Sequence, residues 1–468
     1  MSHTESRLRS IPAVERILQA LGETGLPRPV VVSLVRRELA GLRGGDKVPP
    51  LDEILAQIRG ALDGLRLSRI QPVINGTGIL VHTNLGRSPL GPEVVKTLAE
   101  MAANYNNLEY DLAGGERGGR AGYLERNLAL LCEAEAATVV NNCAAALVLI
   151  LRHLATGERN EVILSRGELV QIGGGFRIPE ILEASGAQLR EVGTTNKTSL
   201  KDYEQAVSPR SGLILKVHRS NFFMDGFVES PSTERIADLA RKCELPFVED
   251  LGSGAMVPTE QIPGVEHEPT PMEVLRRGVD LVCFSGDKLM GGPQAGVIAG
   301  KAKLVTAVKR EPFFRALRCD KLILSALQTT VELYLAGAGE KSMTGAASVP
   351  VLQMLEVSND ELRLRGENIV AALAGLPLEA GVGDGNAQIG GGTLPRSVVP
   401  SVAVNLVPKS LALEKFAVRL RTAAPPVVGY ISEGRFKLDL RTIFPRQDDE
   451  VVRAIRTALA NRQPGEAG

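Results

Sequence analysis

Three things are scarce in this sequence: net charge, cysteine and long apolar runs. Its 468 residues include 54 basic and 54 acidic ones, so a polyanionic partner must be bound by a local basic patch rather than by the field of the whole protein. The five cysteines lack Cys-x-x-Cys spacing and three lie in or beside apolar segments, which favours reduced core thiols and argues against a metal site. The first ten residues contain no apolar signal core, and no uncharged apolar stretch approaches the roughly 18 residues of a membrane span. We therefore expect a soluble, cytoplasmic protein with no membrane segment and no metal.

Strand-like segments alternate with helical ones in the middle of the chain. Short apolar segments are typical of buried strands, and helical segments such as Thr233–Cys243 separate them. This alternation predicts an α/β fold, a mostly parallel sheet with helices on both faces, whose ligands bind at the carboxyl ends of the strands. The expected strands are Ala137–Val140, Glu161–Leu164, Leu213–His218, Phe247–Asp250 and Leu281–Phe284.

The two ends of the chain have other patterns. Before residue 69, apolar residues repeat at helical spacing in three segments that proline and glycine residues separate. Beyond residue 337, a helix-like segment (Val351–Leu373), a glycine-rich one (Gly381–Gly392) and short strands indicate a smaller α+β domain. We expect a helical domain over 1–68, an α/β domain over 69–337 that opens with a linker over 69–91, and the α+β domain over 338–468.

One lysine is expected at the end of a buried strand. Lys288 lies in a tight Ser-Gly-Asp-Lys turn between two apolar runs. Burial favours the neutral amine and lowers its pKa, which is what a lysine that forms a Schiff base requires. An ordinary surface lysine in a turn is the alternative, so the interpretation needs support from elsewhere in the chain.

Two further strand ends supply that support. A helix that begins at Cys143, directly after a strand, offers unpaired N–H groups and small side chains to a phosphate. Asp250 ends another strand, where a carboxylate can hold a pyridinium N–H, although a helix-capping aspartate is also common. A phosphate cup, a ring partner and a lysine thus follow one another at positions 143, 250 and 288, which points to pyridoxal phosphate.

Several arginines are candidates for binding anions. Arg87 lies between glycine and proline in a loop-like segment, where it could clamp a phosphate or carboxylate. Arg315 and Arg318 are three apart, so on a helix they share a face, and a salt-bridged surface helix is the ordinary explanation. Residues 1 to 70 carry 11 basic against 8 acidic side chains, which suits a nucleic acid but also a solvated helix face. The clustered basic residues there are Arg28, Arg36, Arg37 and Arg43.

Eight motifs spread over nearly the whole chain resemble those of the bacterial selenocysteine synthases, the L-seryl-tRNA(Sec) selenium transferases. They are VINGTGILVHTNLGRSPL, NNCAAAL, GELVQIGGGFRIPEIL, EVGTTNKT, LKVHRSNF, VEDLGSG, SGDKLMGGPQAG and PPVVGYISEGRFKLDLRTI. The resemblance implies a fold-type-I pyridoxal phosphate enzyme that replaces the hydroxyl of seryl-tRNA(Sec) with selenium from selenophosphate. It also implies a large ring-shaped homo-oligomer, a decamer, with active sites between subunits.

The resemblance assigns roles to the candidate residues. Lys288 is the Schiff-base lysine and the catalytic base, and Asp250 holds the ring nitrogen. Further cofactor contacts are expected from Cys143, Ala144 and Ser285. The selenophosphate anion is expected on Arg87, Arg315 and Arg318, and the tRNA on Arg28, Arg36, Arg37 and Arg43 of the helical domain.

Two positions depart from the family pattern, and a second function stays open. Cys143 stands where asparagine or a similar small polar residue is expected, and Arg219 stands where a smaller residue is expected. The alternative function is a pyridoxal phosphate lyase of the same superfamily that acts on a small phosphorylated amino compound. A non-catalytic tRNA-binding protein on the same fold is the third hypothesis. The helical segment before residue 69 argues against the lyase, and Lys288 argues against the non-catalytic protein.

Overall fold

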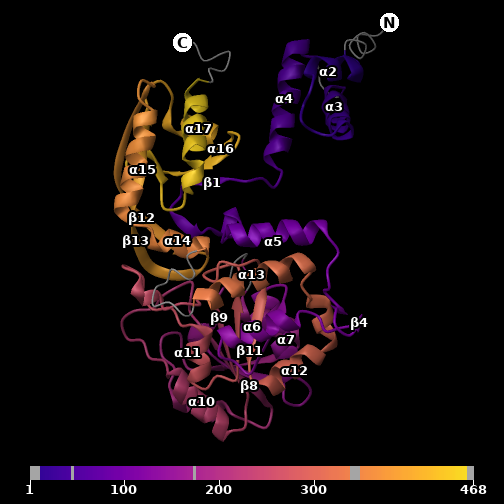
Figure 1. Cartoon of the computed structure of the whole chain (residues 1–468), viewed down its shortest axis with the longest axis vertical. Helices are drawn as coiled ribbons and strands as arrows, with labels where there is room; N and C mark the ends of the chain where they lie inside the picture. The colour runs from indigo at the N-terminus through magenta and orange to yellow at the C-terminus, as the bar shows by residue number, and fades with distance from the viewer. Residues whose placement is uncertain (1–10, 44–46, 172–174, 176, 338–347, 461–468) are drawn as a thin grey trace. The chain divides into compact units, whose positions relative to one another are not determined.

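The computed structural model of the protein describes residues 11–43, 47–171, 175, 177–337 and 348–460 (Figure 1). Its contacts divide the chain into two compact units. The first unit contains the residues up to Val73 together with Thr422–Pro426, and the second contains Ile74–Arg421 and the chain from Val427 onward. The domain boundary expected after residue 337 adjoins residues 338–347, which lie outside the described part, and the three-domain division stays a prediction.

The first unit is a bundle of amphipathic helices, as the helical spacing predicts. Each helix turns its apolar side inward, and Ile17, Val35 and Ile58 are fully buried where the three helices meet. Prolines just before the second and third helices stop the preceding segments and start the new ones. The helices are α2 (Val14–Leu21), α3 (Arg28–Leu42) and α4 (Leu51–Leu67).

The second unit is built on a seven-stranded sheet with the order β5-β11-β10-β9-β8-β6-β7. The strands are parallel except β11, which runs antiparallel to both of its neighbours. All five predicted strands are confirmed to within two residues at each end. The strands are β5 (Ala136–Val140), β6 (Glu161–Ser165), β7 (Gln188–Val192), β8 (Ser211–Val217), β9 (Phe247–Gly252), β10 (Leu281–Ser285) and β11 (Gly296–Gly300).

Helices cover both faces of this sheet, because its central strands are apolar on both sides (Figure 1). One face packs against α7 (Cys143–Leu154), α8 (Ile178–Ser185) and α12 (Ala302–Arg310). The other packs against α6 (Gly122–Leu131), α9 (Leu200–Ala206), α10 (Thr233–Lys242), α11 (Pro271–Arg276) and α13 (Lys321–Gly337). The expected mostly parallel sheet flanked by helices is confirmed.

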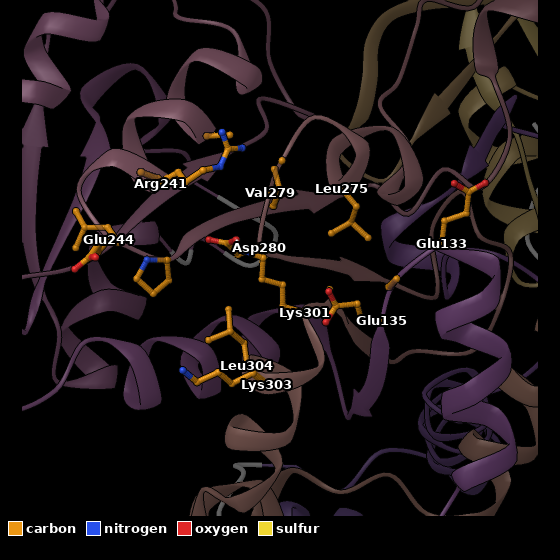
Figure 2. A pocket seen from close by; sticks show the side chains of 17 residues that line it. Glu133, Glu135, Arg241, Glu244, Leu275, Val279, Asp280, Lys301, Lys303 and Leu304 are labelled. Carbon is orange, nitrogen blue, oxygen red and sulfur yellow. Dashed lines mark ion pairs between the residues drawn. The ribbon is translucent and has the colours of Figure 1, made fainter.

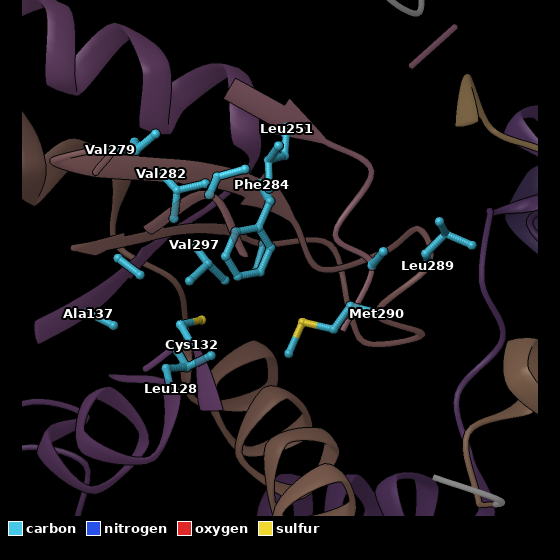
Figure 3. Packing of buried hydrophobic residues seen from close by; sticks show 14 of the residues in the cluster. Leu128, Cys132, Ala137, Leu251, Val279, Val282, Phe284, Leu289, Met290 and Val297 are labelled. Carbon is cyan, nitrogen blue, oxygen red and sulfur yellow. The ribbon is translucent and has the colours of Figure 1, made fainter. Parts of the chain in front are cut away.

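The core on the α6 and α13 side lies directly beneath the strand that leads to Lys288. Val282 and Phe284 of β10 point into this core, where they meet Val297 and Leu128, whereas Cys283 points to the opposite face (Figure 3). Phe284 is fully buried. The strand is therefore held on both sides, and its carboxyl end has a fixed position.

A smaller five-stranded sheet follows, with the order β15-β16-β13-β12-β2. Most of it comes from the C-terminal part of the chain, but β2 comes from the segment expected to be a linker and pairs parallel with β12. Its strands are β2 (Ile79–Val81), β12 (Leu378–Gly390), β13 (Thr393–Pro408), β15 (Tyr430–Ser432) and β16 (Arg435–Asp439). Two strand pairs lie outside both sheets, β1 (Ile74–Asn75) with β14 (Val427–Val428) and β3 (Tyr110–Asp111) with β4 (Glu116–Arg117).

The remaining helices of the second unit include α15, which packs on β12 and β13. The helix expected over Val351–Leu373 is broken by a bend at Val357 and Ser358, and Ser358 caps the second piece. The glycine-rich segment Gly381–Gly392 is mostly strand β12 and ends in a turn of three glycines with positive φ. The helices are α5 (Pro92–Ala103), α14 (Pro350–Glu356), α15 (Asn359–Ala372), α16 (Leu413–Arg421) and α17 (Asp448–Ala460). Across the described residues, no helix is long and apolar enough to cross a membrane.

Candidate active site

The turn that carries Lys288 is held by backbone hydrogen bonds on every side. It joins β10 to β11, and the N–H of Gly286 donates to Ala295 O at 2.9 Å, which closes the turn at its base. The N–H of Leu289 donates to Ser253 O at 3.0 Å, and the phenol of Tyr334 donates to Met290 O at 3.0 Å. Lys288 therefore extends from a rigid support, as a residue that positions a reacting group must.

A segment distant in sequence, just after β2, fastens the same turn. The N–H of Ser88 donates to Asp287 O at 3.2 Å, and its hydroxyl donates to Lys288 O. The neighbouring Arg87 forms an ion pair with Asp287 at 2.7 Å, and Ser285 donates to the other carboxylate oxygen at 2.6 Å. Both carboxylate oxygens of Asp287 thus have a partner. Ser285 was expected to contact the cofactor, but its hydroxyl donates to Asp287 inside the turn.

Asp250 lies near the carboxyl end of β9, next to the lysine turn. It pairs in register with Cys283 of β10, and its backbone carbonyl accepts the N–H of His218 at 2.8 Å. The thiol of Cys143 donates to its Oδ1 at 3.4 Å. Three successive neighbours in the sheet, β8, β9 and β10, therefore bring their carboxyl ends together here, as the strand-end argument predicts.

The helix α7 begins beside Asp250. Asn142 caps it, because its Oδ1 accepts the N–H of Ala145 at 2.8 Å. The N–H groups of Cys143 and Ala144 precede the first intrahelical bonds, so they are free to bind an anion together with the positive end of the helix dipole. A twelve-residue helix with small first residues fits a phosphate monoester at this point.

Gly252 leaves open the space that Lys288 and Asp250 share. A methyl group built on Gly252 would lie 3.9 Å from both Lys288 Nζ and Asp250 Oδ1, and 3.8 Å from the hydroxyl of Ser220. Gly252 has a φ of +65°, which a larger residue rarely adopts. An amine, a carboxylate and a helix N-terminus therefore surround one glycine-lined space, and this set fits pyridoxal phosphate.

Burial shifts the pKa of both charged groups away from their ordinary values. Burial lowers the pKa of Lys288, and the neighbouring Cys143 and Asp250 oppose this only in part. Burial raises the pKa of Asp250, against the hydrogen bond from Cys143 and the charge of Lys288. The lower pKa means that a larger fraction of the Lys288 amine is neutral at a given pH. A lysine that acts as a nucleophile or accepts a proton must be neutral.

Three polar residues near this edge have no role in the sequence-based prediction. Asp287 is adjacent to Lys288 in the motif, and Ser220 and His218 follow strand β8, so the strand-end argument could have found them. His218 lies 3.2 Å from the buried Glu268, and Ser220 contributes to the lining around Gly252. Arg219, whose role was open, lies near enough to Glu168 to favour the ionised carboxylate.

Arg315 and Arg318 do not lie on one α-helix, although both line the same cavity. Arg315 lies in a 3-10 helix (Pro312–Leu317) that ends before Arg318, which has an extended backbone. Pro312 separates this piece from α12, and the extended backbone at Arg318 separates it from α13. Leu317 O accepts the N–H of Asn141 at 3.0 Å, which places the segment beside the N-terminus of α7.

The two arginines line a cavity of about 410 Å³ together with Arg120 and Lys309. Arg318 lies 3.4 Å from Glu109, which also pairs with Arg120 at 2.6 Å. Neither Lys288 nor Arg87 is among the residues that line this cavity. Arg87 is thus bound to the lysine turn, whereas Arg315 and Arg318 line a neighbouring cavity of their own.

The four arginines assigned to tRNA all lie exposed on the first unit. Arg28 pairs with Glu15 at 3.5 Å and Arg37 with Glu38 at 2.9 Å. Such exposed pairs are weak and can exchange for phosphate contacts.

A second cavity, of about 520 Å³, lies at the opposite, amino-terminal edge of the large sheet (Figure 2). Its charged lining residues come from the loops before β5, β9 and β10, from α10, and from the chain after β11, and Asp280 pairs there with Lys301 at 2.5 Å. Neither Lys288 nor Asp250 lines it. The groups that the sequence assigns to the chemistry thus belong to the carboxyl edge and not to this cavity.

Comparison with known proteins agrees with this geometry. Residues 73–444 match the sequence family described as L-seryl-tRNA selenium transferase. A protein of Carboxydothermus hydrogenoformans named L-seryl-tRNA(Sec) selenium transferase is 42% identical over 467 residues, which cover 97% of this chain and 98% of that protein. One of the same name from Geobacter sulfurreducens is 43% identical, over 95% of this chain and 98% of that protein. The chain belongs to the L-seryl-tRNA selenium transferase family.

As a member of that family, the chain also has a fold found in a solved structure of another enzyme. A D-glucosaminate-6-phosphate ammonia-lyase matches with a TM-score of 0.57 and 20% identity, over 83% of this chain and 96% of that one. At this identity the match shows the fold only. The L-seryl-tRNA selenium transferase family match covers the whole carboxyl-edge site, from Arg87 to Arg318.

Proposed function

We propose that this chain converts seryl-tRNA(Sec) to selenocysteinyl-tRNA(Sec), with pyridoxal phosphate as cofactor and selenophosphate as selenium donor. The observation that carries the proposal is the meeting of Lys288 and Asp250 around Gly252, in a chain that matches transferases of this name over nearly its full length. In the net reaction the Cβ–O bond of serine and the Se–P bond of the donor break, while a Cβ–Se and a P–O bond form.

Each residue of the site has one task in this proposal. Lys288 would hold the cofactor covalently, and its lowered pKa suits it to take the proton from Cα of the seryl group. Asp250 keeps the proton on the ring nitrogen, and the N–H groups of Cys143 and Ala144 hold the phosphate. Pyridoxal phosphate, when bound, supplies an electron sink for the negative charge that develops at Cα.

The selenophosphate anion is assigned to Arg87, Arg315 and Arg318. Arg87 is held beside Lys288 by Asp287, and a guanidinium can bind two oxygens of such an anion at once. Arg315 and Arg318 line a basic cavity whose lining includes neither Lys288 nor Arg87 of the same chain. We therefore propose that these two arginines complete the site across a boundary between copies of the chain.

A homo-oligomer is part of the same proposal. Large apolar side chains that a monomer would leave in water are exposed between residues 95 and 130, among them Tyr105, Leu112 and Leu130. They support burial against a second copy, and the family resemblance supports a ring of ten. Light scattering on the purified protein measures the oligomer, and a monomer at micromolar concentration would contradict this part.

The central experiment incubates the purified protein with cofactor and seryl-tRNA(Sec), with and without selenophosphate, and then identifies the amino acid released from the tRNA. Selenocysteine is expected only with the donor. Serine in both samples would contradict the proposal. Ammonia release from a small phosphorylated amino compound, in place of selenocysteine formation, would favour the lyase.

A second experiment addresses the tRNA contacts. Replacement of Arg28, Arg36, Arg37 and Arg43 together by alanine should weaken tRNA binding and reduce its dependence on salt, with a change in slope of about one for each phosphate that is no longer neutralised. Arg16 on α2 is also exposed and serves as the control. An unchanged affinity and salt slope would remove the four arginines from the tRNA site.

A further inference from the structure

Two thiols lie against the Asp250 carboxylate, and the proposed chemistry has no task for either of them. Cys143 is the first residue of α7, and Cys283 lies in register with Asp250 on the adjacent strand β10. One ligand atom each of Cys143, Asp250 and Cys283 lies within 4.8 Å of the other two. Cys143 is half-buried on the cofactor side, whereas Cys283 is fully buried.

The geometry makes the thiols hydrogen-bond donors to the carboxylate. The Cys143 Sγ lies 3.4 Å from Asp250 Oδ1, and hydrogen bonds from both thiols act to lower the pKa of Asp250. The pKa of Cys283 is well above its ordinary value because of its hydrogen bond with Cys143, its burial and the charge of Asp250. The thiols therefore keep their protons near neutral pH and can donate them.

The same three groups could form a ligand set for a soft metal ion, but two features of the site oppose this. A metal needs both thiols deprotonated, and the burial of Cys283 resists that. The amine of Lys288 also borders the space beside Gly252 that Asp250 borders, and its charged form would repel a cation there.

We propose that Cys143, assisted by Cys283, is a positioning residue that orients the Asp250 carboxylate toward the ring nitrogen of the cofactor. The inference rests on the proposed function, since it concerns the same cofactor site. A carboxylate has about four acceptor positions, and a strong donor at one of them would withdraw negative charge from the pyridinium. A thiol is a weak donor, so it fixes the orientation of Asp250 and leaves most of the charge for the ring.

This explains why cysteine is tolerated at position 143, where a small polar residue is expected. The backbone N–H of residue 143 serves the phosphate whatever its side chain is. The side chain, in contrast, faces the carboxylate, so its donor strength adjusts how firmly Asp250 holds the ring proton. The side chain and the backbone of one residue thus act on opposite ends of the cofactor.

The test compares wild type with Cys143→Ala, Cys143→Ser and Cys283→Ala in the full-length protein. The cofactor dissociation constant and the ¹⁵N shift of the ring nitrogen in labelled pyridoxal phosphate are the two readouts. Cys143→Ala should raise the dissociation constant about three- to tenfold, as removal of one weak hydrogen bond allows, and move the ring nitrogen toward its unprotonated shift. Cys143→Ser should restore the affinity to within about twofold while still shifting the ring nitrogen, because a hydroxyl is the stronger donor.

Cys243→Ala is the matched control, because Cys243 is also half-buried but follows α10, away from Asp250. Cys283→Ala should change the affinity less than Cys143→Ala, and a thermal melt separates this effect from a loss of core packing. A ring nitrogen shift that is the same in wild type, Cys143→Ala and Cys143→Ser would overturn the inference. Stoichiometric zinc in the purified protein, or a disulfide between the two cysteines, would overturn it as well. A wild type that binds no cofactor would instead overturn the proposed function itself.

Discussion

Each edge of the seven-stranded sheet carries an aspartate and a lysine, but the two pairs differ in how far they are buried. At the amino-terminal edge, Asp280 and Lys301 form an ion pair beside an open cavity, and the lysine side chain is 59% exposed (Figure 2). At the carboxyl edge, Asp250 and Lys288 are enclosed. Burial raises the pKa of Asp250 and lowers the pKa of Lys288, so it favours the neutral form of each side chain. Strand β10 runs from one pair to the other, because Asp280 directly precedes it and the turn that carries Lys288 follows it. Burial at a strand end, rather than the presence of charge, therefore distinguishes the candidate site.

The largest effect is expected from removal of the lysine amine. Lys288→Ala should lower selenocysteine formation by more than about 10³-fold, because it removes the covalent anchor and the base together. Borohydride treatment followed by peptide mapping should label residue 288 in the wild type and no other lysine. A label elsewhere, or full turnover by the variant, would falsify the assignment.

The next largest effect is expected from the charge at Asp250. Asp250→Asn should reduce turnover by about 10²-fold or more, because a neutral amide cannot hold the ring nitrogen protonated. Steady-state kinetics and the visible absorption of the bound cofactor measure the change. Asp280→Asn, at the other end of the same strand pair, is the control and should leave turnover within about twofold. Equal losses in both variants would mean that folding, and not the ring partner, is affected.

Removal of Arg87 tests how the carboxyl edge is held together. Arg87→Ala should lower turnover by about 10-fold to 10²-fold at limiting selenophosphate and destabilise the fold by about 1 to 3 kcal/mol, because the buried Asp287 loses its partner. In the double variant with Asp287→Asn the fold should recover while the turnover does not. Recovery of both would assign Arg87 a structural task only.

A pH dependence of stability is expected from Glu168, which follows β6 at the carboxyl edge. Burial raises the pKa of Glu168 from 4.5 to about 7, so the folded protein binds a proton that the unfolded chain has lost in this range. The free energy of unfolding should therefore fall between pH 4.5 and pH 7, by an amount on the order of 3 kcal/mol for this group, and level off above. Glu168→Gln keeps an acceptor for the N–H of Val217 but cannot titrate. Urea unfolding from the lower to the upper end of this pH range should show a flatter profile for the variant, and parallel profiles would contradict the assignment.

The smallest effect is expected at the amino-terminal edge. Lys301→Ala breaks an exposed ion pair, so it should change the free energy of unfolding by less than about 1 kcal/mol and leave turnover unaltered. The same two assays apply. A loss of turnover comparable to that of Lys288→Ala would remove the distinction between the two edges.

The sequence predicted those parts of the candidate site whose position depends on a single strand or helix. Strand ends at Asp250 and Lys288 and the helix start at Cys143 follow from apolar runs and small residues, which act over a few neighbours. The contact of Arg87 with Asp287 joins residues 200 positions apart, and no local pattern predicts it. The helix expected to carry Arg315 and Arg318 differs for another reason: their spacing fits an α-helix, but Pro312 begins a 3-10 helix that ends before Arg318. The strand β12 was obscured by its glycines, which lower strand propensity although the pairing with β13 overrides it.

The short strand β2 connects the five-stranded sheet to the turn that follows β10 of the seven-stranded sheet. It is hydrogen-bonded to β12 of the small sheet, and a few residues after its end Arg87 and Ser88 grip the turn that bears Lys288. The position of the Lys288 turn is thus tied to that of the small sheet through the few peptide units between Val81 and Arg87.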